Sequence, residues 1–216
     1  MAADNGHNAD HEAGESRGID RVNGFSDAVF AVAITLLILT ITVPIVSDTS
    51  QLGGELEAMW PKFVGFLISF VIIGSFWISH HVMFRHLERH KPGFLWINLF
   101  FLMFIVLLPF STDLMSEYNN SVLAVVFYDL NMVAASSALM LLWWYMSYHE
   151  CLVEKDLDPA LRRHLLFTQT SIMLIFLCAT GIAFINISAS QYFYFMLIPV
   201  NSILEHVHRK ARRETS

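Results

Sequence analysis

The chain has 216 residues, of which 55% are hydrophobic and 15% are charged, and its mean hydropathy is +0.52. A soluble domain of this size carries roughly 25% charged residues. Here the charges are clustered between long apolar runs, which is the pattern of a polytopic membrane protein and excludes an ordinary soluble enzyme. The net charge of −6 comes partly from the N-terminal segment and indicates nothing about partners.

The first 20 residues are polar, acidic and rich in small side chains. They lack a basic segment followed by an apolar core, so we do not expect a secretory signal peptide. Because the segment has little apolar surface to bury, residues 1–20 are expected to form a disordered cytoplasmic tail.

An apolar segment of about 20 residues crosses the hydrocarbon core of a bilayer as a helix. We expect six such spans, which makes the chain an all-α polytopic membrane protein. The connections are short, so residues 21–208 are expected to form one six-helix transmembrane domain, followed by a basic cytoplasmic tail over residues 209–216. The spans cover residues 25–46, 60–81, 94–114, 122–146, 165–185 and 191–207, of which the last is the shortest.

The lysines and arginines predict how the spans are oriented. With six spans, every basic residue except Lys62 falls on one side of the membrane. Cytoplasmic loops carry the excess of Lys and Arg in membrane proteins. We therefore expect a multi-pass protein of the cell membrane whose N- and C-termini are both cytoplasmic, and we expect no nucleic-acid partner.

The first span opens on RVNGFSD, residues 21–27, and continues as almost pure hydrocarbon. A charged side chain at bilayer depth costs about 2.5–3.5 kcal/mol on insertion scales and normally faces the protein interior with a partner. Two interpretations of Asp27 stay open. With Ser26 it is a helix N-cap, or it is a buried polar lock that joins the first helix to its neighbours.

Candidate partners for such a lock lie at the same depth in other spans. The second span ends in FWISHH, and its Trp77 and His81 are four residues apart, so they share a helix face. His80 stands beside them, and the third span begins near Asn98. An indole, an imidazole and an amide are therefore expected to converge on Asp27 and Ser26.

Further along the first span the apolar residues form a stripe. At about 100° per residue, Val32, Leu36, Leu39 and Val43 fall on one side of the helix, with Thr35 at its edge. From the residues alone this is an ordinary helix-packing or lipid-facing stripe. Ile34 lies on the opposite side, where we expect it to face lipid.

The motif Arg21-x-x-x-Phe25-Ser26-Asp27 is similar to the RxxxFSD signature that begins the first helix in the transmembrane protein 175 family. The following AVFAVAITLLIL and the FWxxHH near the end of the second span also resemble that family. The resemblance covers essentially the whole chain in layout. It implies a potassium-selective or potassium-preferring ion channel, and neither an enzyme, a resident metal nor a cofactor.

The resemblance also implies an assembly. Prokaryotic members are six-helix subunits of homotetramers in which the first helices line a central pore, and the narrowest part is apolar. The residues that match the constriction are Val32, Leu36 and Leu39, and Thr35 matches a hydroxyl linked to potassium preference. A valine at the first position, where isoleucine or leucine is usual, widens that constriction. The residues that match the signature and the lock between the first three helices are Arg21, Phe25, Ser26, Asp27, Trp77, His81 and Asn98.

Two other classes of membrane protein are weighed against a channel. A secondary transporter is typified by a matched pair of Gly/Pro-broken spans, and no such pair is visible. A membrane di-iron oxygenase uses many histidines on one face, but HxxxH occurs only once, at His86 and His90. The role of Asp129 stays open between a structural hydrogen bond and a functional one.

Overall fold

The computed structural model describes residues 3–87, 91–148, 159–197 and 199–200. The elements are α-helices and short 3-10 helices. In chain order they are α1 (Ala3–Leu36), η1 (Leu37–Thr40), η2 (Thr49–Gln51), α2 (Leu52–Ala58), α3 (Trp60–Arg85), α4 (Pro92–Glu117), α5 (Val122–Tyr148), α6 (Pro159–Ala183), α7 (Ile187–Phe193) and η3 (Tyr194–Met196).

Within the described part of the chain, five helices are long and apolar enough to cross a membrane. This confirms an all-α polytopic membrane protein. The five spans are Gly18–Thr40, Trp60–Arg85, Pro92–Glu117, Val122–Ser147 and Leu161–Ala183. Of the expected sixth span, α7 and η3 cover only the beginning, and residues 201–207 lie outside the described residues.

The first span differs from its expected bounds at both ends. The structure carries α1 back to Ala3, through the segment for which we expected disorder, since extending an established helix costs much less than nucleating one. At the other end the helix stops at Thr40, and Ile41 is extended. A run of β-branched residues and Pro44, which restricts the residue before it, disfavours helix here. Val43 therefore lies beyond the helix, and its place in the stripe was wrong.

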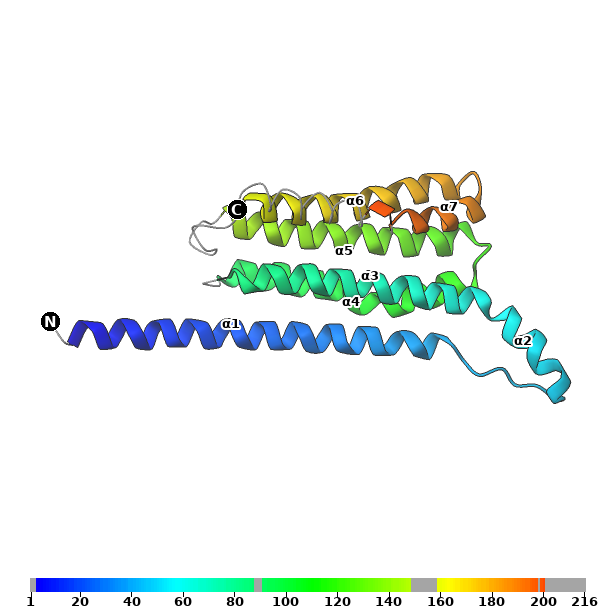
Figure 1. Ribbon diagram of the computed structural model, residues 1–216, viewed down its shortest axis with the longest axis horizontal. Coiled ribbons are helices and arrows are strands. Elements are labelled where there is room, and N and C mark those ends of the chain that lie inside the picture. The colour runs from blue at the N-terminus through cyan, green and yellow to red at the C-terminus, as the bar shows by residue number, and fades with distance from the viewer. Residues whose placement is uncertain (1–2, 88–90, 149–158, 198, 201–216) are drawn as a thin grey trace.

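Successive spans run antiparallel, so α1, α4 and α6 begin at the end of the bundle where α3 and α5 finish (Figure 1). Helix α4 packs against α5, and α5 against α6. Helix α1 contacts α3 and α4 and lies at the edge of the bundle, on the side away from α5 and α6.

Aromatic side chains hold α1 to this edge. The Phe30 ring of α1 lies 5.9 Å from that of Phe101 in α4, and Phe101 lies 6.2 Å from Phe76 in α3. All three are fully buried. Burying a phenylalanine contributes roughly 1.5–3 kcal/mol relative to exposure in water; between helices in lipid, close packing of such rings replaces that driving force.

Polar contacts connect the interior helices at other depths. The Ser69 hydroxyl of α3 lies 2.8 Å from that of Thr112 in α4 and 3.1 Å from that of Tyr128 in α5. Near the same end Gly65 comes so close to Ser116 that a Cβ atom would clash with its hydroxyl. These contacts fix the orientation of three helices relative to one another. Apolar side chains alone select poorly among such orientations, because lipid tails are equally apolar.

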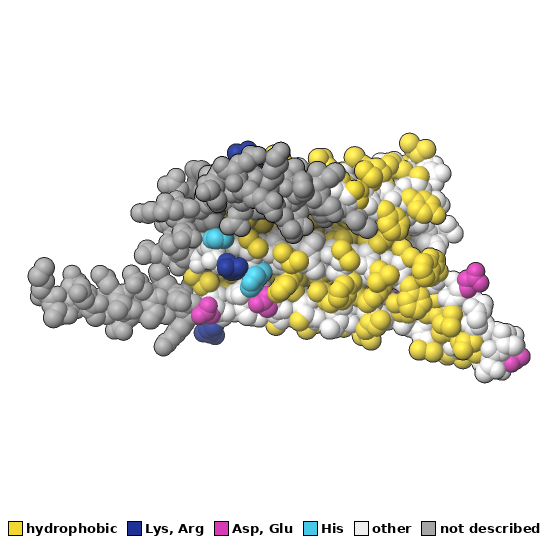
Figure 2. All heavy atoms as spheres, in the orientation of Figure 1, with side chains coloured by type: hydrophobic (Ala, Val, Ile, Leu, Met, Phe, Trp, Pro, Cys, Tyr) yellow, Lys and Arg dark blue, Asp and Glu magenta, His cyan; other side chains and the backbone are white. Residues whose placement is uncertain are grey.

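Charge is distributed unevenly along the bundle. On the face shown in Figure 2, hydrophobic side chains cover the middle, and the visible Lys and Arg side chains lie toward the end where α1 begins. At the opposite end Lys62 forms an ion pair with Glu117 at 2.5 Å. Such a partly exposed pair contributes at most about 1 kcal/mol.

Candidate functional site

The Asp27 carboxylate lies in the interior of α1 and accepts a hydrogen bond from another helix. Trp77 of α3 donates its indole N–H to Oδ1 at 2.8 Å. Asn23, one turn earlier, donates to Oδ2 at 3.4 Å. Because α1 begins long before this point, neither Asp27 nor Ser26 caps a helix N-terminus, and that interpretation was wrong.

Ser26 is fully buried and joins α1 to α4. Its hydroxyl accepts a hydrogen bond from the Asn98 amide at 3.0 Å and donates to the Val22 carbonyl at 3.0 Å. The Asn98 carbonyl oxygen lies 2.9 Å from Nε2 of His80 in α3. Since that oxygen can only accept, His80 carries the proton on Nε2. A continuous chain of polar contacts thus crosses three helices.

The imidazole in this chain is His80 and not His81, which our sequence analysis placed in the lock. His80 follows Phe76 and precedes Phe84 by one turn each, so it shares their buried face, and its ring lies 4.2 Å from that of Phe84. His81 follows Trp77 by one turn and stacks on that indole at 5.5 Å. No hydrogen bond joins His81 to Asp27 among the described residues.

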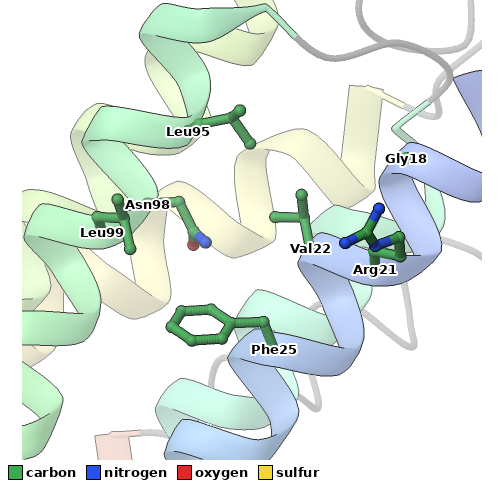
Figure 3. A pocket seen from close by; sticks show the side chains of 7 residues that line it. All are labelled: Gly18, Arg21, Val22, Phe25, Leu95, Asn98 and Leu99. Atoms are coloured by element: carbon green, nitrogen blue, oxygen red, sulfur yellow. The ribbon is translucent and has the colours of Figure 1, made fainter.

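Arg21 and Phe25 take no part in these hydrogen bonds. Both are exposed on α1 and line a cavity between the start of the first span and the start of α4, with the Phe25 ring directed toward α4 (Figure 3). The signature residues thus divide between two places. Ser26 and Asp27 hold the helix, and Arg21 and Phe25 border a cavity.

The predicted constriction residues lie on an uncovered face of α1 and of η1, which continues it and contains Leu39. The exposed fractions are 56% for Val32, 39% for Leu36 and 68% for Leu39. Ala33 and Leu37, on the other side of the helix, are buried. In the most apolar stretch of the first span 22% of the residues are buried, whereas the share is 33–56% in the other four spans. Ile38, in η1 one turn beyond Ile34, is also exposed, at 51%.

Thr35 lies on the same uncovered face. Its hydroxyl is 2.9 Å from the carbonyl oxygens of both Ala31 and Val32, to which it donates. Because the proton is directed back into the helix, the lone pairs of the oxygen stay available on the exposed side. Ile34, which we expected to face lipid, is half-buried against the core and was wrongly placed.

Asp129 is the second carboxylate inside the bundle, and it is fully buried in α5. It accepts hydrogen bonds from Tyr194 of η3 at 2.7 Å and from Thr180 of α6 at 3.3 Å. Asp129 therefore ties the last described segment to the bundle. Tyr194 was not singled out from the sequence, where nothing distinguishes it from Tyr192 two residues earlier.

These features define a class of protein: a membrane-embedded helical bundle whose first helix is fixed by polar contacts and leaves an apolar face uncovered. Comparison with known proteins then gives the family. The family model described as "Endosomal/lysosomal potassium channel TMEM175" matches residues 21–109. A potassium channel of Streptomyces collinus is 38% identical over 66% of this chain and 71% of its own. The chain belongs to the TMEM175 family.

Other relatives and solved structures agree. A potassium channel of Chamaesiphon minutus is 40% identical over 50% of this chain and 54% of its own. The human protein named endosomal/lysosomal proton channel TMEM175 is 33% identical over 46% of this chain and 21% of its own. The crystal structure of a lysosomal potassium-selective channel TMEM175 homologue from Chamaesiphon minutus covers 87% of this chain and 97% of its own, with 28% identity and a TM-score of 0.74.

A second crystal structure, of a variant of another TMEM175 potassium channel, has 20% identity and a TM-score of 0.60 and supports the fold alone. The family consists of ion channels, so the chain is not an enzyme. This sets aside both the di-iron oxygenase and the secondary transporter.

Proposed function

We propose that the chain is the subunit of a potassium-conducting channel of the cell membrane, a homotetramer in which four α1 helices surround the ion path. The bacterial relatives that match it over at least half its length are named potassium channels. The observation that carries the proposal is the uncovered face of α1, with Val32, Leu36 and Leu39 exposed on the least buried span.

A single subunit leaves this face without a partner. Closed cyclic symmetry is the usual arrangement of identical subunits, and it brings the same face of every copy to the axis. In that arrangement Val32, Leu36 and Leu39 form successive apolar rings. An apolar ring that is too narrow to keep water blocks ions, because an ion sheds hydration there with nothing to replace it. The rings therefore act as the constriction.

Thr35 gives the constriction its preference among ions. Its hydroxyl proton is held by the helix, so each copy offers oxygen lone pairs at one depth between the rings of Val32 and Leu36. Four such oxygens replace part of the hydration shell. Potassium is dehydrated more easily than sodium, so this partial replacement favours potassium modestly.

The polar chain at the start of the span fixes the rotation of α1. Hydrocarbon side chains pack about as well against lipid tails as against other helices, so they select one rotation poorly. The bonds from Trp77 to Asp27 and from Asn98 to Ser26 hold opposite neighbours, α3 and α4, at one height. In this proposal the lock orients the constriction and does not line the path.

The orientation in the membrane follows from charge. Arg21 lies near the start of the first span, on the side of the bundle where α3 ends and where α4 and α6 begin. The ends of those three helices carry Arg85, Lys91 and Arg162, and we assign this side to the cytoplasm. The predicted tail over residues 209–216 belongs to the same side by this assignment and lies outside the described residues.

Flux from liposomes tests the function directly. The purified chain is reconstituted with a potassium gradient, and potassium, sodium and proton fluxes are compared under a fixed membrane potential. We expect potassium flux to exceed sodium flux. Because the vertebrate relatives are named proton channels, proton flux is the sharpest rival: a proton current without potassium current contradicts the proposal.

A further inference from the structure

A groove runs along α3 on the side that faces away from α1. Helix α7 and η3 pack on α6, on the side of the bundle remote from α1 (Figure 1). Between this segment and α3 lie two cavities, of about 280 Å³ and about 350 Å³. Ile68 lines both cavities and precedes Trp77, which bonds Asp27, by two and a half helical turns. The two side chains therefore project from opposite sides of α3, and the groove is separate from the face that we propose to turn to the axis.

The two cavities adjoin and follow the direction of the helix. Ile68, Tyr194 and Phe195 line both of them. The outer cavity begins at Pro61, at the start of α3, and the inner cavity extends to Ser75. At 1.5 Å per residue, α3 rises about 21 Å between these two residues. The groove therefore runs from the end of the bundle into the interior of the membrane, parallel to acyl chains.

The inner cavity is apolar, and its two hydroxyl side chains are already engaged. Ser75 donates to the Ile72 carbonyl at 2.8 Å, and Tyr194 donates to Asp129 at 2.7 Å. The outer cavity is more polar, but its polar side chains are uncharged; they are those of Ser116, Asn119, Ser188, Gln191, Tyr192 and Tyr194 together with the Trp60 indole. Neither lining contains a charged side chain among the described residues. The groove thus combines an uncharged polar end with a hydrocarbon interior.

Ser116 supplies an unused hydrogen-bonding group at the polar end. Its side chain is only 6% exposed, and its hydroxyl has no hydrogen-bond partner in the described part of the chain. The hydroxyl is directed toward Gly65 of α3, where the missing Cβ leaves room for it, and both residues line the outer cavity. A buried hydroxyl without a partner is costly, so such groups are normally satisfied by protein, water or a ligand.

We propose that this groove binds one uncharged lipid with a hydroxyl-bearing headgroup per subunit, taken from the leaflet that meets the start of α3. The headgroup hydroxyl bonds Ser116 in the outer cavity, and one acyl chain lies in the inner cavity. An anionic headgroup would lose hydration here without gaining a cation. The exposed rings of Trp60 and Tyr192 border the outer cavity, as aromatic side chains do at a membrane interface.

The bound lipid fills the space between α3 and the segment formed by α7 and η3. Tyr194, which lines both cavities, also bonds Asp129 in α5. The lipid therefore supports the docking of this segment on the bundle. Neither the binding nor this stabilising effect depends on which helix lines the ion path.

Native mass spectrometry of the full-length protein, released from an amine-oxide detergent, tests the site. Three probes share one oleoyl chain. Monooleoylglycerol is uncharged and carries hydroxyls, methyl oleate lacks a hydroxyl, and oleoyl lysophosphatidylglycerol adds a phosphate. We expect monooleoylglycerol to be retained at up to one molecule per subunit. It should be retained about fivefold better than methyl oleate, as one additional hydrogen bond provides, and better than the lysophosphatidylglycerol.

Two substitutions test the two parts of the argument. Ser116→Ala should remove the advantage of monooleoylglycerol over methyl oleate, and because its hydroxyl bonds no described residue, the fold should stay intact. Val64→Trp should fill the outer cavity and reduce retention of all three probes. Ser121→Ala and Phe63→Trp are the matched controls, since they alter a hydroxyl at the same end of the bundle and a neighbouring exposed ring of α3 outside both linings. Both controls should retain monooleoylglycerol as the unaltered protein does.

Equal retention of monooleoylglycerol and methyl oleate overturns the proposal, as does stronger retention of the lysophosphatidylglycerol. An unchanged advantage in Ser116→Ala also overturns it, since water and not a lipid would then satisfy the hydroxyl. If Val64→Trp changes the number of subunits and leaves the lipid count unchanged, a second copy of the chain occupies the groove and the proposal fails. None of these readouts measures ion flow, so a failure of lipid binding and a failure of conduction are distinguished.

Discussion

At the scale of single residues, exposed side chains of the first span border the proposed ion path, and buried side chains pack the span against the rest of the bundle. Leu36 and Leu39 are exposed, and Leu37 between them is fully buried. Adjacent positions on one helix are therefore expected to respond differently to substitution. Removing an exposed side chain changes the path, and removing a buried one changes the fold.

Leu36→Ala should raise the potassium conductance severalfold. A ring of smaller side chains leaves a wider opening that stays hydrated, and this lowers the dehydration barrier for the ion. Single-channel recording in planar bilayers measures this. Leu174→Ala is the matched control, since Leu174 is 51% exposed on α6, the side of the bundle remote from α1. An equal rise in conductance in both variants would show that Leu36 is not part of the constriction.

Thr35→Ala should lower the preference for potassium over sodium while current remains measurable, since the ring of hydroxyl oxygens is lost and the helix stays intact. Thr35→Ser keeps the oxygen and should keep the preference. Reversal potentials under bi-ionic conditions give the permeability ratio. A preference that survives Thr35→Ala unchanged would assign selectivity to another part of the path.

His80→Ala should destabilise the protein by at least about 1–3 kcal/mol, because the Asn98 carbonyl oxygen loses its buried donor. Thermal unfolding in detergent measures the loss. His81→Ala removes a neighbouring imidazole that stacks on Trp77, and its effect should be smaller. A larger loss of stability in His81→Ala than in His80→Ala would show that His81, and not His80, holds the three helices together.

At the scale of elements, most of the helices follow from hydropathy, whereas the ends of α1 do not. Long apolar runs bounded by charges predict spans, and the second to fifth spans were found within a few residues of their expected bounds. The end at Thr40 depended on the backbone restriction before Pro44 and on a β-branched run, which a window of hydropathy does not register. A helix that continues into a polar segment likewise lacks a hydropathy signal.

The sequence also predicted most of the residues that meet near the start of the first span. The motif directed attention to Ser26 and Asp27, and the common depth of the span ends indicated Trp77 and Asn98 as their partners. It favoured His81, whereas the structure has His80 in the chain of polar contacts, because the choice depends on which face of α3 the Phe76 and Phe84 rings bury. That is a property of packing among three helices and not of the motif.

Helix α7 is held to the bundle by side-chain contacts. Asn186 caps its start by accepting from the Ala189 N–H at 3.0 Å, and Ser190 donates to the Ala179 carbonyl at 2.8 Å. Tyr194 then bonds Asp129 at 2.7 Å. These contacts dock the segment that follows the fifth long span.

Tyr194→Phe should weaken this docking by about 1–3 kcal/mol, because a buried carboxylate loses a donor. Hydrogen exchange of the α7 backbone should accelerate. Tyr192→Phe is the control, since Tyr192 is 73% exposed. Unchanged exchange in Tyr194→Phe would show that the hydroxyl does not hold the segment.

At the scale of the whole molecule, the account depends on where α1 lies in the assembly. One subunit exposes an apolar face on α1, the helix at one edge of the bundle, and this face is either turned to a shared axis or left in lipid. Apolarity alone does not distinguish these two environments. Contact with water and with permeating ions does.

The most direct measurement places a cysteine at one exposed position of η1, the 3-10 turn that continues α1. Leu39→Cys is made in a background in which the two native cysteines carry Cys151→Ser and Cys178→Ser. A positively charged methanethiosulfonate reagent is applied during recording in a planar bilayer. Leu174→Cys, in the same background, is the control.

We predict that the reagent reduces current in Leu39→Cys, because the attached cation occupies the path, and leaves current in Leu174→Cys unchanged. Native mass measurement of the same samples should give four times the subunit mass. Two results would contradict the central claim that α1 lines the ion path. One is unchanged current in Leu39→Cys when mass measurement shows that the cysteine has been labelled. The other is equal inhibition of both variants.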